Sequence, residues 1–589
     1  MSRTQSSFTR IIARRDFLRG SAAIMAGVST LKSLAVLAQQ EIAPNTDYSS
    51  VVEEIKKTLP VAIALRDIPG ASIALVDGEN IVWSEGFGYT DRSQKVKVTG
   101  DTLFHVGSIS KSFTALGVLK AVDKGLLALD DPVKKHLSWF SVNSGSGAAE
   151  AEKITIRHLL SHHSGLGTWS PLGNPSDPQY HTRTFEEVVK STRDSWLKFP
   201  AGERFEYSNQ GIDLAGYALE VTSGKPFVDF LREELLVPLG MTVSTFDQAK
   251  AMQKEACAVG YLSKRPVPIV NGIVMPLIAA GGLFASANDL ARFIIFHSRG
   301  GSGVAKQILP QSFLQEMYAP QFTADDQMSG YGLGVYKAIQ YKTVRLSHGG
   351  LGYGISAHYR FLPEHKIGVV VVTNQDAAHN APDLASRVIE LMLAAKLGTV
   401  PKNKPLRSTD IPIASLDESA LRRFEGTYLL YEGVLARFKY ERRNLFHIVG
   451  SEKLKLDAAS SSEFTRGSRR YRFLFAENGK PKGVQIFDPY YDPQTAENSV
   501  VYLLVNDTPA DAGGSNKPEW SRHVGRYAGT FIGSRSEVKV SSKNGYLYLN
   551  GELKLIETKP DFFLTADGDA VIFKNERLSV GNKLYSNRK

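Results

Sequence analysis

Two predicted β-hairpins that lie far apart in the sequence constrain the fold of this chain most strongly. They comprise residues 71–88, with Asp-Gly-Glu-Asn at the turn, and residues 355–373. Between them the periodicity is helical, most clearly over residues 108–124 and 210–222, each followed by glycine. Strands at both ends with helices between predict an antiparallel sheet flanked by helices, with a helical insertion. We therefore expect an α/β (α+β) domain over residues 46–396.

The composition changes after this domain, because short alternating strands replace the helical pattern. Residues 421–428 and 523–530 have similar sequences, and each precedes several strand candidates. This repetition predicts two small all-β modules of meander or barrel type. The predicted boundaries are a linker at 397–412, a first β module at 413–505, a second linker at 506–517 and a second β module at 518–589.

The first 38 residues have the character of an export signal. Arg14-Arg15 precedes a weakly apolar run that ends at Val36-Leu37-Ala38, where small residues suit signal cleavage. This pattern predicts a twin-arginine-type signal over residues 1–38 and a periplasmic or secreted protein. The alternative is an N-terminal helical arm, which would need a partner surface to bury its apolar run.

Charge and composition exclude several classes of partner. Half of the net charge of +10 lies in the first 38 residues, so the remaining chain is too weakly basic for a dedicated nucleic-acid module. No apolar run is long enough to span a membrane once the signal is removed. The single cysteine, Cys257, excludes an intramolecular disulfide and a cysteine metal cluster, and no His-Glu-x-x-His motif occurs. Neither a metal nor another cofactor is predicted, and the oligomeric state stays open.

A serine and a lysine three residues apart open the first strong helix. Ser108 and Lys111 would share one helical face, where a lysine amine with a lowered pKa can act as a base for the serine hydroxyl. Burial and the positive end of the helix dipole both favour the neutral amine. The alternative is that Ser108 is a plain helix N-cap. A second match, Ser29 to Lys32, shows that the motif alone is weak.

Two further short motifs follow in the chain. Tyr207-Ser-Asn209 precedes the second helix, where a phenol could relay a proton and an amide could orient the lysine. His348-Gly349-Gly350 lies at a predicted strand edge, where glycines allow the backbone to approach a ligand closely. The alternatives are a helix cap for the first motif and an ordinary turn for the second, and similar triplets occur elsewhere in the chain.

Together with their surroundings, these motifs resemble the serine beta-lactamase-related family of class C beta-lactamases, penicillin-binding proteins, D-aminopeptidases and esterases. The resemblance spans residues ~50 to ~395 and rests on residues 104–114, 159–166, 199–202, 207–209, 238–241, 281–283, 331–334 and 348–350. It implies a beta-lactamase/transpeptidase-like sandwich and an acyl-enzyme on Ser108, with Lys111 as base. It further implies that Tyr207 shuttles protons, that Asn209 assists, that His348 and Gly350 belong to the third motif, and that the amides of Ser108 and Leu351 form the oxyanion hole.

The third motif departs from the Lys-Thr-Gly of true class C lactamases, because His348 replaces the lysine and Gly349 the threonine. A histidine is only partly charged near neutral pH, which favours an esterase or D-aminopeptidase-like hydrolase over a lactamase. The expected substrate is a small-molecule or peptide ester or amide, with cell-wall peptide among the candidates. The alternatives are a penicillin-binding D,D-peptidase or weak beta-lactamase, and a non-catalytic receptor for cell-wall fragments or penicillin. The two β modules resemble in layout those of three-domain D-aminopeptidases.

Overall fold

The computed structural model describes residues 46–588 with gaps, the longest of which are 400–415, 488–498 and 506–517. The predicted export signal and both predicted linkers therefore fall wholly or mostly outside the described residues. Within the described part of the chain, no helix has the length and apolar character needed to cross a bilayer.

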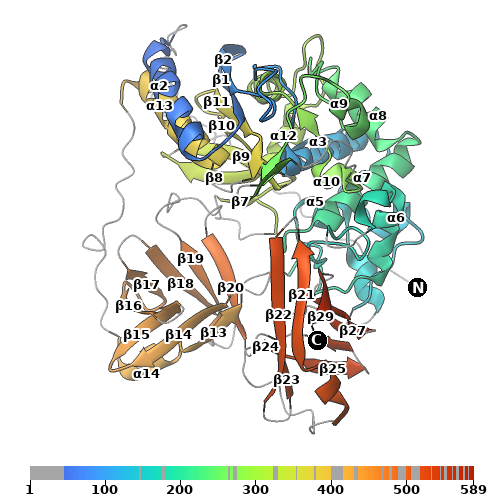
Figure 1. The fold of residues 1–589 in the computed structure, drawn as a ribbon, viewed down its shortest axis with the longest axis vertical. Helices are drawn as coiled ribbons and strands as arrows, with labels where there is room; N and C mark the ends of the chain where they lie inside the picture. Colours follow the sequence, from blue (N-terminus) through green and yellow to red (C-terminus); the bar gives the residue numbers. More distant parts are fainter. Residues whose placement is uncertain are drawn as a thin grey trace, which may run out of the picture. The chain divides into compact units, whose positions relative to one another are not determined.

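A seven-stranded sheet forms the centre of the N-terminal domain, and both predicted hairpins belong to it (Figure 1). Its order is β2-β1-β11-β10-β9-β8-β7, so strands from the two ends of the domain pair directly in the middle. Every pairing in it is antiparallel, as predicted. The strands are β1 Gly70–Asp77, β2 Asn80–Gly88, β7 Gly330–Tyr331, β8 Tyr336–Gln340, β9 Thr343–Gly352, β10 Ile355–Leu362 and β11 Ile367–Thr373.

Helices cover both faces of this sheet. On β11, Val370 and Val372 join the main apolar core together with residues of α3 Ser110–Asp123 and α11 Ala287–Ser298. The intervening Val369 and Val371 are also fully buried but lie outside that core, as strand alternation requires. Figure 1 shows α2 Ser49–Leu65 and α13 Asn380–Leu397 side by side along the sheet.

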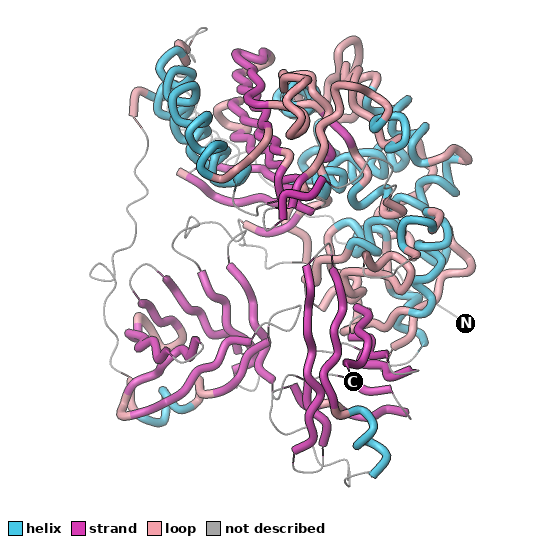
Figure 2. The backbone as a smooth tube through the Cα atoms, viewed as in Figure 1, coloured by secondary structure: helices cyan, strands magenta, loops and turns pink. Residues whose placement is uncertain are grey.

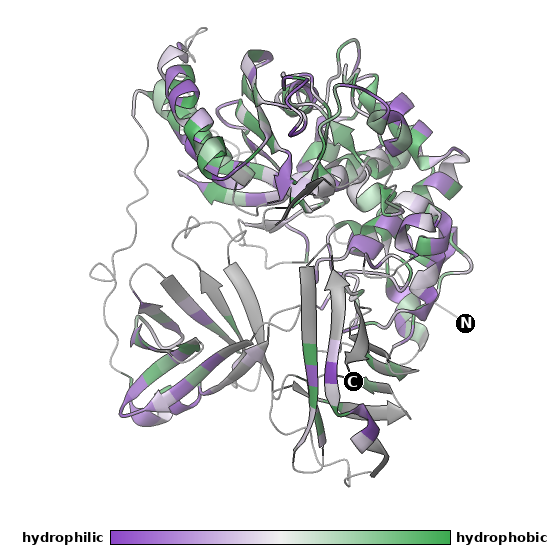
Figure 3. Cartoon of the chain, in the orientation of Figure 1, coloured by the Kyte–Doolittle hydropathy of each residue, from purple (hydrophilic) through white to green (hydrophobic). Residues whose placement is uncertain are grey.

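The peripheral helix α2 and the central helix α3 differ in their sequence patterns. In α2 the buried residues Val51, Ile55, Leu59 and Ile63 recur every four positions, and Figure 3 shows hydrophobic and hydrophilic residues alternating along it. By contrast, α3 is buried on nearly all sides, because it packs against α7 Asn209–Ser223 and its Ser112 contacts Tyr359 of β10. A central helix of this kind can keep an ionisable side chain away from water.

The helical insertion surrounds α3. Its main members are α5 Ile156–Leu160, α7, α8 Phe227–Leu231 and α10 Ile278–Gly281, and α10 contacts both α3 and α7. The predicted helix over residues 210–222 is α7, which ends at Gly224 in a left-handed conformation with φ of 66°. The fold is therefore the α/β sandwich of an antiparallel sheet and helices that the sequence predicts.

The C-terminal part is almost entirely strands, as Figure 2 shows. Eight strands, from β13 Gly426–Leu429 to β20 Ser499–Val505, close into a barrel around an aromatic core. The intervening strands are β14 Leu435–Glu441, β15 Asn444–Val449, β16 Glu452–Ala458, β17 Glu463–Arg466, β18 Arg469–Phe475 and β19 Pro481–Phe487.

A nine-stranded sheet follows in the order β24-β23-β22-β21-β29-β28-β27-β26-β25 and has a core of its own. Its strands are β21 Gly525–Phe531, β22 Ser534–Lys543, β23 Tyr546–Leu549, β24 Leu553–Lys554, β25 Ile556–Lys559, β26 Phe562–Leu564, β27 Ala570–Lys574, β28 Arg577–Val580 and β29 Lys583–Arg588.

The two β modules begin with the same local interaction. In the barrel, the hydroxyl of Tyr428 donates to the carbonyl of Phe424 at 3.1 Å, and in the second module Tyr527 donates to His523 at 2.9 Å. In each case a short helical turn precedes the first strand, and the tyrosine spans four residues back to it. The repeat in the sequence therefore corresponds to the same local structure at the start of each module, although one module is a closed barrel and the other a nine-stranded sheet.

Candidate active site

Ser108 lies in a single 3-10 turn, Gly107–Ile109, that directly precedes α3. Its side chain caps neither this turn nor α3, so the alternative of a plain helix cap is wrong. The turn is held by Ser110, whose hydroxyl donates to the carbonyl of Gly107 at 2.6 Å and accepts from the amide of Leu283 at 3.0 Å. The hydroxyl of Ser108 is thus left available for other contacts.

Lys111 is fully buried, and its amine has three oxygen neighbours. Its Nζ lies 3.0 Å from Ser108 Oγ, 2.7 Å from Asn209 Oδ1 and 2.8 Å from the carbonyl oxygen of Ala280. The ring of Tyr207 faces the amine with its centroid 4.8 Å from Nζ. Burial lowers the pKa of Lys111 from 10.5 to about 7. The charge of the nearby Asp213 acts in the opposite direction and partly offsets this lowering. A large fraction of the Lys111 amine is therefore neutral at neutral pH.

The Tyr207-Ser-Asn209 segment combines two roles. Ser208 is the N-cap of α7, since its Oγ accepts from the amide of Gly211 at 3.0 Å. This confirms the cap alternative for one residue of the motif, while Asn209 instead contacts Lys111. The amide of Ser208 donates to Nδ1 of His162 at 3.1 Å, and the rings of His162 and Tyr207 lie 4.4 Å apart. The Ser208 cap and His162 together fix the positions of Tyr207 and Asn209.

His348 lies inside β9, so the alternative of an ordinary turn is wrong. The motif nevertheless occupies a local strand edge, because β8 pairs with β9 only as far as Ser347. Nδ1 of His348 lies 2.7 Å from the carbonyl oxygen of Gly349 and must donate to it, which leaves Nε2 to accept from the hydroxyl of Tyr331 at 3.0 Å. Burial and the nearby Lys111 lower the pKa of His348 to about 3. The side chain is therefore a neutral imidazole at physiological pH.

Two glycines bring the backbone of β9 against the turn that carries Ser108. A Cβ built on Gly350 would lie 1.9 Å from the carbonyl oxygen of Val106 and 3.3 Å from the amide nitrogen of Ser108. A Cβ built on Gly107, which has φ of 53°, would lie 3.3 Å from the amide nitrogen of Leu351. The amides of Ser108 and Leu351 therefore lie on two backbone segments in direct contact, as an oxyanion hole requires.

Exposed apolar side chains lie beside the histidines next to the site and on the strand that carries the third motif. Phe205 packs edge-on against His162 and His163, and Phe322 packs against His163 at 5.0 Å between ring centroids. Phe205, Phe322 and Leu351 are all exposed despite their apolar character. We name Phe205, Phe322 and Leu351 the apolar rim.

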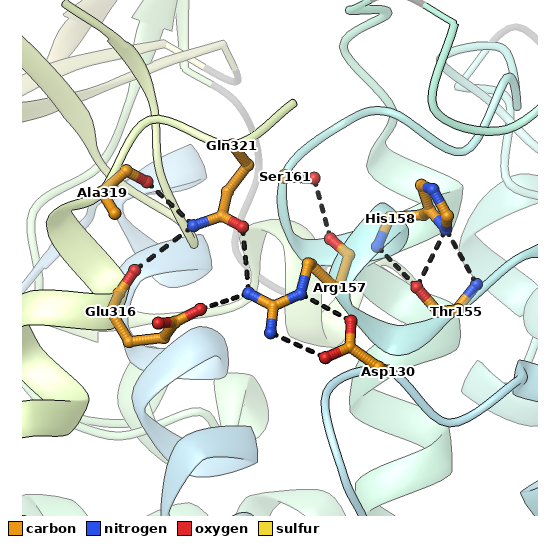
Figure 4. Close-up of polar contacts among 8 residues, drawn as sticks. All are labelled: Asp130, Thr155, Arg157, His158, Ser161, Glu316, Ala319 and Gln321. Atoms are coloured by element: carbon orange, nitrogen blue, oxygen red, sulfur yellow. Dashed lines mark hydrogen bonds and ion pairs between the residues drawn. The ribbon is translucent and has the colours of Figure 1, made fainter. Parts of the chain in front are cut away.

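An ion-pair network supports the segment that carries Phe322 (Figure 4). Arg157 binds both carboxylate oxygens of Asp130, at 2.7 and 2.9 Å, and also contacts Glu316 and Oε1 of Gln321. Gln321 in turn donates to the carbonyl of Ala319 at 2.9 Å. These contacts join α5 to the chain that follows α12 Gln311–Tyr318 and place Phe322 beside His158, whose ring it stacks on at 4.5 Å.

Three residues around Lys111 and His348 were given no role by the sequence motifs. Ala280 supplies a carbonyl to Lys111, Tyr331 supplies a hydroxyl to His348, and Asp213 is a buried carboxyl one helical turn beyond Asn209. The four-residue spacing from Asn209 to Asp213 along α7 is the only sequence signal that could have drawn attention to the last of these. Among the described residues, no group of three or more His, Cys, Asp or Glu side chains could hold a metal ion.

Comparisons with known proteins agree with this geometry. The sequence model described as Beta-lactamase matches residues 57–393, more than half of the chain. Protein flp of Staphylococcus aureus (strain N315) is 30% identical over 246 residues, which cover 41% of this chain and 48% of flp. Penicillin-binding protein 4* of Bacillus subtilis (strain 168) is 23% identical over 414 residues, 67% of this chain and 87% of that protein.

Among solved structures, the octameric penicillin-binding protein homologue from Pyrococcus abyssi has a TM-score of 0.51 and 25% identity, over 76% of this chain and 99% of that chain. The chain spans about half the length of flp. The match over residues 57–393 includes the whole sheet, the helical insertion and all three motifs. This chain belongs to the beta-lactamase family.

Proposed function

We propose that this protein is a serine hydrolase that cleaves an ester or amide bond through an acyl-enzyme on Ser108. The observation that carries the proposal is the position of the Lys111 amine, 3.0 Å from the serine hydroxyl. A neutral amine has two N–H groups and one lone pair. Asn209 Oδ1 and the Ala280 carbonyl can only accept, so they take the two N–H groups. The lone pair is then directed at the hydroxyl of Ser108.

The reaction follows from this arrangement. The Oγ of Ser108 attacks the substrate carbonyl carbon while its proton passes to Lys111 Nζ. The developing oxyanion is stabilised by the amides of Ser108 and Leu351. Collapse of the tetrahedral intermediate breaks the bond to the leaving group, which receives the proton from Lys111 through Tyr207. Water then adds to the acyl carbonyl, passes a proton back to the base, and releases the acid product and free Ser108.

The surroundings of Ser108 favour a neutral and partly apolar substrate. The third motif presents a neutral imidazole that is already hydrogen-bonded to Tyr331, so it offers no cation to a substrate carboxylate. The apolar rim offers contact area for an aromatic or aliphatic group. Both features support an esterase or D-aminopeptidase-like activity. Export through the twin-arginine-type signal is part of the same proposal, since cell-wall peptide esters or amides would be met outside the cytoplasm.

A penicillin-binding D,D-peptidase or weak beta-lactamase is the second candidate, because two of the relatives are named penicillin-binding proteins or homologues. The test labels the purified full-length chain with a fluorescent fluorophosphonate and, separately, with a fluorescent penicillin, using Ser108→Ala as the control. We expect fluorophosphonate labelling that disappears in the Ser108→Ala variant and little penicillin labelling. Labelling by both probes would favour the second candidate. Labelling by neither would overturn the hydrolase and favour a receptor for cell-wall fragments. A panel of aryl esters, D- and L-amino acid amides and nitrocefin then identifies the substrate.

A further inference from the structure

A buried carboxyl group is linked to Lys111 through a single backbone residue. Asp213 is only 1% exposed and follows Asn209 by one turn of α7. Its Oδ1 accepts from the amide of Ala280 at 2.9 Å, and the carbonyl of Ala280 accepts from Lys111 Nζ at 2.8 Å. One residue of α10 is therefore held between the carboxyl group and the amine.

The second oxygen of this carboxyl group, Oδ2, is buried without a hydrogen-bond partner among the described residues. A buried ionised carboxylate that is incompletely hydrogen-bonded is costly unless a cation lies nearby. Lys111 is the cation whose charge acts on Asp213. Burial raises the pKa of Asp213 to about 7, and the hydrogen bond from the Ala280 amide and then the charge of Lys111 oppose that rise. Each group thus favours the charged form of the other.

The other titratable groups around the pair do not supply this charge. His162, which follows α5, and His348, on β9, both have a pKa lowered by burial, so both are neutral. Tyr207 faces Lys111 with its ring from the segment before α7. The helix α10, Ile278–Gly281, contains no titratable residue. The electrostatic balance of the buried site is therefore set mainly by one amine and one carboxyl group.

We propose that Asp213 and Lys111 work as a charge pair, in which Asp213 is a positioning residue that compensates the ammonium formed when Lys111 takes the proton of Ser108. This inference rests on the proposed hydrolase function. During acylation the serine proton moves to Nζ, and the positive charge forms beside the ionised Asp213 carboxylate. When the leaving group takes that proton through Tyr207, the amine is neutral again and the carboxylate is unchanged. Without the carboxylate, the ammonium would form as an uncompensated buried charge.

The test is the pH dependence of fluorophosphonate labelling in the full-length chain with Asp213→Asn. Asparagine keeps an oxygen that can accept from the Ala280 amide but carries no charge. Loss of the carboxylate favours the neutral amine, so the acid limb of the labelling rate should move to lower pH by about one unit. The maximum rate should fall by about tenfold or more, because the ammonium is no longer compensated. Asp213→Glu restores the charge and should return the acid limb toward that of the wild type.

The matched control is Asp289→Asn, which removes another fully buried carboxyl group, one that binds Arg292 and Ser244. Its acid limb should coincide with that of the wild type. If Asp213→Asn does not fold, Asp213→Thr gives a second neutral variant whose hydroxyl can accept from the Ala280 amide, with the same shift expected. An acid limb unmoved in a folded neutral variant overturns the charge pair while leaving the hydrolase proposal intact. Absence of labelling in the wild type overturns both.

Discussion

Replacement of Lys111 by methionine should change how the stability of the N-terminal domain depends on pH. The pKa of Lys111 moves from its usual value of 10.5 to about 7 on folding, which corresponds to about 5 kcal/mol at ~1.36 kcal/mol per pKa unit. Between these two pH values the unfolded chain holds a proton on Lys111 that the folded chain has released. Stability rises with pH wherever the unfolded state binds more protons. The wild type should therefore gain about 2 kcal/mol relative to Lys111→Met between pH 7 and pH 9.

The measurement is urea unfolding of both proteins at pH 7, 8 and 9, followed by tryptophan fluorescence. Four of the five tryptophans, Trp83, Trp139, Trp169 and Trp196, lie in the N-terminal domain, so the signal reports mainly on it. Loss of the Lys111 cation also makes ionisation of Asp213 less favourable in the variant, which acts in the same direction. Lys57→Met, at an exposed position on α2, controls for the loss of a lysine as such. If the free energy of unfolding of the wild type, relative to that of Lys111→Met, stays flat or falls as the pH rises, the reasoning is refuted, because Lys111 would then not be a desolvated amine.

Two further substitutions test the backbone contact and the neutral histidine. Gly350→Ala places a Cβ 1.9 Å from the Val106 carbonyl, so β9 must shift, and fluorophosphonate labelling should slow by at least ~100-fold, as for loss of one oxyanion donor. Gly167→Ala, where a Cβ would meet only a side chain at 4.0 Å, should label normally, and equal rates in the two variants would contradict the prediction. Tyr331→Phe leaves Nε2 of His348 without its donor and should lower the free energy of unfolding by about 1–3 kcal/mol, with unchanged urea unfolding as the contrary result.

The features that could be predicted from the sequence are those with a period or a short local pattern. The two hairpins and the helix α7 were predicted within one or two residues of their observed bounds, because apolar patterning and glycine at the helix end act locally. Ser108, Lys111, Tyr207 and Asn209 could be named because their spacing and order resemble those of a known family. Their catalytic roles remain predictions until the labelling experiments are done.

Other features depend on contacts between distant segments, which no local pattern carries. Ala280 holds Lys111 through its backbone carbonyl, so any residue type at that position would present the same oxygen. The neutral state of His348 depends on burial and on the nearby Lys111, and its Nε2 is bound by Tyr331, seventeen positions earlier in the chain. His105-Val106-Gly107 is one of the triplets elsewhere in the chain that are similar to the third motif, yet Gly107 contacts the strand that carries that motif. Such pairings become visible only when the chain is folded.

The meeting of Gly107 and Gly350 has a consequence for how this protein could diversify. The separation between the amides of Ser108 and Leu351, the proposed oxyanion donors, is set by backbone that touches backbone, with no side chain between them. A Cβ on Gly350 would displace the Val106 carbonyl, and a Cβ on Gly107 would be strained by its positive φ and tight against Leu351, so a mutation at either position would need a compensating change. The exposed Phe205, Phe322 and Leu351 carry no such mutual restriction. Selection for new acyl or leaving groups could therefore alter these three positions repeatedly while the donor geometry stays constant.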